Sequence, residues 1–189
     1  MSEIIPVSEL AGHCNEATAW RILEEVSRHS MEGMRRIVNP SIIGISEDGQ
    51  FALEAAQEQQ SGFDPHEVEA NSRTEASTVW SIGATLFYIV MGRCVMNGKG
   101  GEGQSETSKL PYMRSEWPEM SELVQRCLQF EPANRPTLQE IHDKTVQNLK
   151  RCQDNIRRGP KIKTNTSKPN ELETIEKDLA FWPERMQGR

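Results

Sequence analysis

The segment STVWSIGATLFYIVMG, residues 77–92, is the least polar stretch of the chain. Its apolar side chains cover nearly every side of a helix, which is typical of a helix that is buried all round. A helix that spans a membrane needs about 20 mostly apolar residues, and this stretch is shorter. The sequence therefore predicts a soluble core helix that ends at Gly92. The large side chains expected to fill this core are those of Trp80, Leu86 and Phe87.

Amphipathic patterns on both sides of this segment predict further helices. Asn15 suits the N-cap of a helix that continues to about Arg36, and Pro40 marks its end. Proline is favourable in the first turn of a helix, so two more helices are expected to start at Pro118 and Pro136. The chain is therefore expected to be mainly α-helical.

Residues 41–54, SIIGISEDGQFALE, carry the one strong strand pattern. Asp48-Gly49 is a favourable turn between two arms in which apolar residues alternate with others. These apolar residues are Ile43 and Ile45 on the first arm and Phe51 and Leu53 on the second. The pattern predicts one small β-hairpin.

The glycine-rich polar segment NGKGGEGQSETS, residues 97–108, predicts a mobile loop. A phosphate-binding loop needs a preceding strand, a following helix and a Lys-Ser/Thr pair at fixed spacing. This segment has none of these features, so no nucleotide site is expected there.

Composition toward the C-terminus predicts how the chain is divided. Residues 1–156 are expected to form one helical domain. Residues 157–170 are rich in Lys, Thr, Asn and Pro, which is typical of a basic flexible linker. Residues 171–189 form a C-terminal tail in which a short helix is possible. The tail sequence AFWPERM echoes SEWPEM at residues 115–120, so this tail is a candidate for forming homo-oligomers.

Charge and cysteine spacing argue against several classes of function. The net charge of −6 disfavours binding to nucleic acid or to a membrane surface, because both need a positive field. The four cysteines are far apart, which predicts reduced thiols rather than a zinc site or disulfides. His13, Cys14 and His29 lack a convincing fourth metal ligand, so neither metal nor cofactor is expected. The first ten residues carry no secretory signal pattern, and a cytoplasmic location is expected.

Three phrases, in this order, resemble the C-terminal lobe of a protein kinase. SGFDPHEVEA, residues 61–70, is similar to the Ala-Pro-Glu segment that closes a kinase activation loop. Residues 77–92 look like the family's Asp-Val-Trp-Ser-Leu-Gly helix, and residues 116–141 look like its closing region with an Arg-Pro-Thr turn. The resemblance covers about residues 5–150 and implies a protein-kinase C-lobe-like helical domain. It also implies an ion pair between Glu67 and Arg135.

The same comparison implies that catalysis is lost. The catalytic loop should fall in residues 34–45, where no aspartate occurs and Ser41 or Ile42 takes the place of the metal-binding asparagine. Ala55 and Ala56 stand near the metal-binding aspartate of the family, and Thr78 replaces the aspartate that holds the catalytic loop. Only about fifteen residues precede the first long helix, which leaves no room for an ATP-binding lobe. No catalytic residue is therefore expected.

We therefore expect a catalytically inactive, C-lobe-only module that binds a protein or peptide, organised like the kinase noncatalytic C-lobe (KIND) domains. An alternative is a degenerate kinase or nucleotide-binding regulator that acts with an N-terminal lobe from another chain. A third possibility is a regulatory subunit with the tail as its tether. The sequence leaves undecided which surface binds. Without an N-terminal lobe, apolar area on the first long helix and the hairpin would be exposed, but the first nineteen residues can also cover it. The candidate interaction residues are Phe51, Trp117, Phe181 and Trp182.

Overall fold

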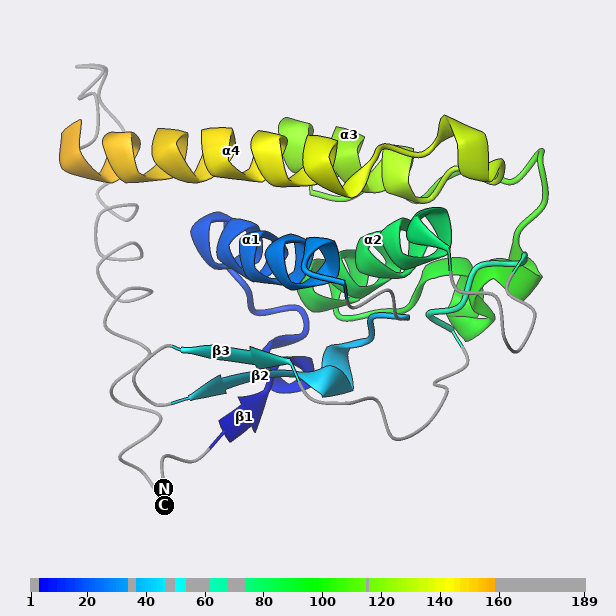
Figure 1. Cartoon of the computed structure of the whole chain (residues 1–189), viewed down its shortest axis with the longest axis horizontal. Helices are drawn as coiled ribbons and strands as arrows, with labels where there is room; N and C mark the ends of the chain where they lie inside the picture. Colours follow the sequence, from blue (N-terminus) through cyan, green and yellow to red (C-terminus); the bar gives the residue numbers. More distant parts are fainter. Residues whose placement is uncertain are drawn as a thin grey trace, which may run out of the picture. The chain divides into compact units, whose positions relative to one another are not determined.

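The fold is mainly helical, with one small antiparallel sheet (Figure 1). Contacts between residues divide the chain into a unit over residues 1–152 and a second over residues 153–189. The computed structural model describes residues 4–33, 37–46, 50–53, 62–67, 74–114 and 116–158 of the 189-residue chain.

Helix α2 (Glu75–Met91) is the central helix of the first unit, and thirteen of its seventeen residues are buried. The side chain of its N-cap Thr74 accepts a hydrogen bond from the Ser77 amide, and the Ser77 hydroxyl accepts one from the Thr74 amide, which completes a capping box. Gly92 follows with a φ of 69°, a backbone conformation that favours glycine. The core residues Trp80, Leu86 and Phe87 are all buried. Among the described residues, no helix has the length and apolarity needed to cross a bilayer.

Helix α1 (Glu16–Met31) begins at the predicted N-cap, because the Asn15 side chain accepts a hydrogen bond from the Thr18 amide at 2.8 Å. The helix ends at Met31, so the prediction that it continues to Arg36 is wrong. Gly33 has a φ of 110°, which turns the chain away from the helical path. Ile37 consequently lies outside the helix and is buried in a connecting segment.

The predicted hairpin is confirmed as β2 (Ile43–Ser46) and β3 (Phe51–Leu53), with Ile43 opposite Leu53 and Ile45 opposite Phe51. The turn at Asp48-Gly49 lies outside the described residues. A third strand, β1 (Ile4–Pro6), pairs antiparallel with the other edge of β2, so the expectation of a two-strand hairpin alone is wrong. Strand β1 is too short for a periodic signal and forms by pairing with β2.

Helix α3 (Pro118–Cys127) begins at the predicted proline. Helix α4 (Leu138–Arg158) begins two residues after Pro136, because Thr137 forms a capping box with Glu140. The helix therefore includes the first two residues of the predicted linker. The rest of the linker and the whole tail lie outside the described residues.

The glycine-rich segment is not a loop alone, as predicted, but contains short helical turns. It forms two short 3₁₀ helices, Val95–Gly98 and Gly100–Gly103, which precede a turn at residues 105–108. Gly101 is buried against residues 64–66, and its amide donates to the Asp64 carbonyl at 2.8 Å. The glycines therefore serve a close approach between two backbones, which polar composition alone does not distinguish from mobility.

Candidate functional site

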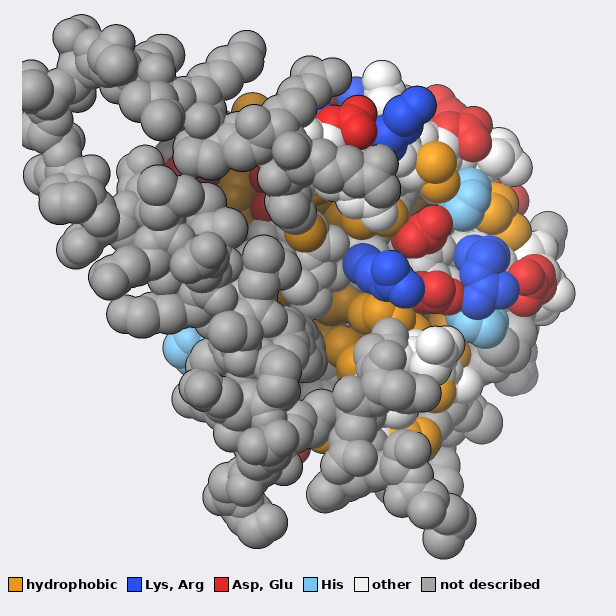
Figure 2. Space-filling model, turned by 90° about the vertical axis from the view of Figure 1, so that its left-hand side faces the viewer, with side chains coloured by type: hydrophobic (Ala, Val, Ile, Leu, Met, Phe, Trp, Pro, Cys, Tyr) orange, Lys and Arg blue, Asp and Glu red, His pale blue; other side chains and the backbone are white. Residues whose placement is uncertain are grey.

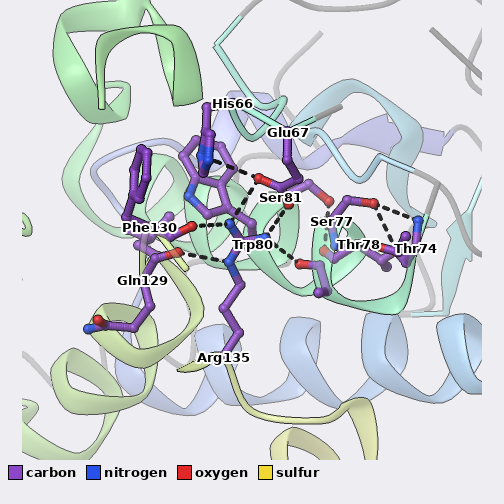
Figure 3. A network of polar contacts seen from close by, with 12 residues as sticks. His66, Glu67, Thr74, Ser77, Thr78, Trp80, Ser81, Gln129, Phe130 and Arg135 are labelled. Atoms are coloured by element: carbon purple, nitrogen blue, oxygen red, sulfur yellow. Dashed lines mark hydrogen bonds and ion pairs between the residues drawn. The ribbon is translucent and has the colours of Figure 1, made fainter. Parts of the chain in front are cut away.

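Arg135 is the centre of a network of polar contacts, which Figure 3 shows. Its side chain is 0% exposed. The two terminal nitrogens, Nη1 and Nη2, each donate to one carboxylate oxygen of Glu67. Nη1 also donates to the Ala76 carbonyl at 2.9 Å, and Nη2 donates to that of Phe130 at 2.9 Å. Nε donates to the Gln129 carbonyl at 2.8 Å. This set of contacts, the Arg135 network, joins three separate parts of the chain.

Glu67 is held in its charged form within this network. Burial is the largest influence and raises the pKa of its carboxyl. The hydrogen bonds from Arg135, a backbone hydrogen bond and the charges of Arg135 and His66 together outweigh burial and leave the pKa below its usual value of 4.5. His66 lies beside it, with Nδ1 3.3 Å from Glu67 Oε2. The His66 ring also stacks on Phe130, with the ring centroids 3.8 Å apart. These contacts fix residues 62–67 against the start of α2 and the end of α3.

A second polar connection fixes the glycine-rich segment to the same core. Trp80 Nε1 donates to Gln104 Oε1 at 3.0 Å, and Gln104 Nε2 donates to the Leu128 carbonyl at 2.6 Å. All three groups are buried, where an unmade hydrogen bond is costly. The side chain of Gln104 therefore links α2 to the end of α3.

The buried segment that contains Val38 is held by α2. Its Val38 amide donates to Ser81 Oγ at 2.8 Å, and Thr85 Oγ1 donates to the Val38 carbonyl at 2.9 Å. Thr78 does not make this connection, because its hydroxyl donates to the Thr74 carbonyl within the helix. The described residues of this segment and the hairpin, 37–46 and 50–53, contain no aspartate or glutamate.

Sequence reasoning missed the role of Ser81 and Thr85, although a signal was present. Both are hydroxyl residues in an otherwise apolar helix, and both are buried. A buried hydroxyl almost always has a hydrogen-bond partner. Their positions therefore indicated that another backbone segment packs against this side of α2, without indicating which one.

Burial makes the four cysteines less reactive than free thiols. Burial raises the pKa of the Cys14 and Cys127 thiols to about 12, and burial also raises the thiol pKa of Cys94 and Cys152. A protonated thiol is a poor nucleophile and a poor metal ligand. No group of three His, Cys, Asp or Glu side chains with metal-binding geometry occurs among the described residues.

The predicted interaction residues are not brought together. Phe51 is half-buried on β3, and Trp117 is half-buried just before α3. The Arg114 guanidinium carbon lies 5.1 Å from the centre of the Trp117 ring. Phe181 and Trp182 lie outside the described residues, as do Ala55 and Ala56. The two aromatic residues that are described therefore lie on different elements, β3 and the start of α3.

Part of the surface carries acidic and basic side chains side by side, next to hydrophobic ones (Figure 2). On α1, Arg28 pairs with Glu25 at 2.6 Å and with Glu32 at 3.0 Å. His29 lies within 4.0 Å of Glu25 and 3.8 Å of Glu32. These charges compensate one another, so this face of α1 has no strong preference for a charged ligand.

No protein-family model matches this chain, and no curated protein matches it significantly. The polar contacts around Arg135 and Gln104 connect residues 66–67, the glycine-rich segment, α2 and the end of α3.

Proposed function

We propose that this chain is a catalytically inactive module, similar to the C-terminal lobe of a protein kinase, that acts by binding another protein. The observation that carries the proposal is the buried, bidentate pair between Glu67 and Arg135. The kinase resemblance implies this pair from two separate phrases of the sequence. The two residues lie 68 positions apart. Between those phrases lies α2, the helix that the resemblance assigns to the lobe's core.

The surroundings of Val38 support the noncatalytic part of the proposal. Phosphoryl transfer depends on carboxylates that bind Mg²⁺ and orient the attacking hydroxyl. The segment that contains Val38 carries apolar, amide and hydroxyl side chains at the corresponding places, from Ile37 to Ile42. Two hydroxyls of α2 hold its backbone. This arrangement maintains the shape of the loop without supplying groups for the reaction.

Rigidity supports the binding part of the proposal. Contacts that fix loops before a partner arrives lower the entropy that is lost on association. The Arg135 network fixes residues 62–67, and Gln104 fixes the glycine-rich segment. We place the activity in the cytoplasm, with a protein or peptide as the partner. We also propose that the tail, through Phe181 and Trp182, contributes to homo-oligomers.

Binding of ATP tests the noncatalytic assignment. The melting temperature of the purified chain should be unchanged by ATP, with or without Mg²⁺, because a ligand stabilises a protein only when it binds the folded state. A nucleotide-dependent rise in melting temperature, or transfer of phosphate to a substrate protein, would instead favour a degenerate kinase that uses an N-terminal lobe from another chain.

Purification from native cells tests the binding assignment. The tagged intact chain should retain at least one protein in a fixed stoichiometric ratio after washing at moderate salt. The same purification with residues 1–158 separates partners of the lobe from those of the tail. If neither form retains a partner in such a ratio, the proposed function is wrong.

A further inference from the structure

The segment that leads into α3 exposes a cluster of residue types that dominate protein interfaces. Met113 is buried, and its amide donates to Ser121 Oγ at 3.2 Å. Its neighbour Tyr112 is 58% exposed, which is the highest value among the exposed large hydrophobic residues of the described chain. Arg114 and Trp117 are each half-exposed. Trp, Tyr and Arg are the residues most enriched in binding hot spots.

Arg114 is fixed in place before any partner binds. Its Nη2 donates to the Gly12 carbonyl at 3.1 Å and is 3.5 Å from the Val90 carbonyl. Its guanidinium also lies over the Trp117 ring, where the cation is attracted to the aromatic face. Among the described residues, Nε and Nη1 of Arg114 make no hydrogen bond. These two nitrogens carry three N–H donors, which are oriented and remain available to an external acceptor.

Arg114 is a partly exposed cation on a chain with a net charge of −6. The backbones of Gly12 and Gly92 pack against each other, so the residues that follow them, His13 and Arg93, flank this contact and are exposed. Glu116 is the exposed acid on the α3 side of Arg114. A guanidinium with unused donors is complementary to a carboxylate.

We infer that the surface formed by Tyr112, Arg114 and Trp117 docks an acidic peptide segment of a partner protein. One carboxylate of the peptide accepts hydrogen bonds from Arg114, and a neighbouring apolar side chain packs against the two aromatic rings. This inference rests on the proposed function and names the surface and the kind of partner. The carboxylate supplies specificity, and the aromatic contacts supply most of the buried apolar area.

Selection from a displayed library of random dodecapeptides tests the inference. Peptides retained by the intact wild-type chain should be enriched in Asp or Glu next to an apolar residue. The best peptide is then synthesised with a fluorescent label and titrated with variants. Arg114→Gln should weaken its binding by about tenfold, because hydrogen bonds to charged groups are strong. Tyr112→Ala should weaken binding by several-fold.

Two further variants separate loss of binding from loss of folding. Arg114→Lys keeps the charge and should retain part of the affinity, although it loses the paired donors. Arg126→Gln removes a different exposed arginine, which pairs only with Glu140 among the described residues, and should leave affinity unchanged. Circular dichroism and melting temperature are measured for each variant. Tyr112 is largely exposed, so its variant tests the surface even if Arg114→Gln is unfolded.

Three outcomes would overturn the docking surface. The first is a selection without acidic enrichment, and the second is equal affinity for wild type, Arg114→Gln and Tyr112→Ala. The third is concentration-dependent self-association that Arg114→Gln abolishes, which would assign the surface to a second copy of the chain. In each case, stoichiometric capture of a partner from native cells would still support the proposed function. Failure of the docking surface can therefore be distinguished from failure of the proposed function.

Discussion

At the residue scale, the contacts of Arg135 explain how the fold accommodates its buried positive charge. Its guanidinium has five N–H donors, and the five hydrogen bonds of the Arg135 network match them. Three acceptors are backbone carbonyls, and the other two are the oxygens of Glu67. Lysine, with three donors on one nitrogen, cannot reproduce this geometry.

Replacing Glu67 with glutamine tests whether the buried charge of Arg135 needs the counter-charge of Glu67. Glu67→Gln keeps the shape of the side chain but leaves the Arg135 charge buried without a counter-charge. We expect the free energy of unfolding to fall by about 3 kcal/mol, the lower end for a broken buried pair, because Glu67 is 23% exposed. Urea denaturation measures the change.

The matched control for Glu67→Gln is Arg126→Gln. Its ion pair with Glu140 is about half-exposed on both sides, and such pairs contribute less than about 1 kcal/mol. If both variants lose a similar, small amount of stability, the Arg135 network is not a major stabilising contact.

The same carboxylate makes stability depend on pH. The folded pKa of Glu67 lies below its usual value of 4.5, so the unfolded chain binds this proton more tightly. The stabilisation by Glu67 is therefore complete at neutral pH and is lost as pH falls through the folded pKa. The difference in unfolding free energy between wild type and Glu67→Gln should be constant from about pH 7 to pH 5 and shrink at lower pH. A difference that stays constant until acid unfolding would contradict the ionised pair.

At the scale of elements, boundaries follow local chemistry that the sequence only partly reveals. The prediction of α3 is right at its first residue, because proline at that position is a direct signal. Helix α1 is shorter than predicted, because apolar spacing continues past the point where Gly33 turns the backbone. Strand β1 is absent from the prediction, because three residues are too few to show a period.

The contact between the glycine-rich segment and residues 64–66 is tested by Gly101→Ala. A Cβ at this position would overlap the amide nitrogen of His66 and the backbone of Pro65. Because neither backbone can move without losing the Asp64 hydrogen bond, we expect a loss of about 3 kcal/mol of stability. Thermal or urea unfolding measures it.

Gly98→Ala is the control, since a Cβ there meets no atom within 4 Å. Its φ of 84° alone should cost about 1 kcal/mol. Equal losses for the two variants would mean that conformational strain, rather than close packing, explains the glycines of this segment.

At the scale of the whole molecule, polar side chains connect elements that are distant in the sequence. Ser27 on α1 lies 3.3 Å from the His142 ring nitrogen on α4, and Arg151 on α4 donates to Glu16 on α1 at 2.6 Å. These contacts, with the Arg135 network, hold the helices around α2. The proposed function depends on this framework keeping its surface loops in one arrangement.

Removing the tail tests its proposed role in assembly. The intact chain should associate as its concentration rises, and residues 1–158 should remain monomeric, because aromatic side chains such as Trp182 are frequent anchors of interfaces. Size-exclusion chromatography with light scattering measures both masses. Residues 1–158 should unfold with unchanged cooperativity, which verifies that the lobe is intact. Identical masses at every concentration would exclude a role of the tail in self-association.

The sequence by itself determined the helical class, the buried character of α2, the presence of the hairpin and the start of α3. These follow from periodicity, proline and capping residues, which act over a few neighbouring positions. Only the tertiary structure decided that Ser81 holds Val38, that Gly101 packs on the backbone near His66, and that Arg114 lies over Trp117. Such contacts depend on which segments meet, and a one-dimensional pattern contains no direct record of distances across the fold.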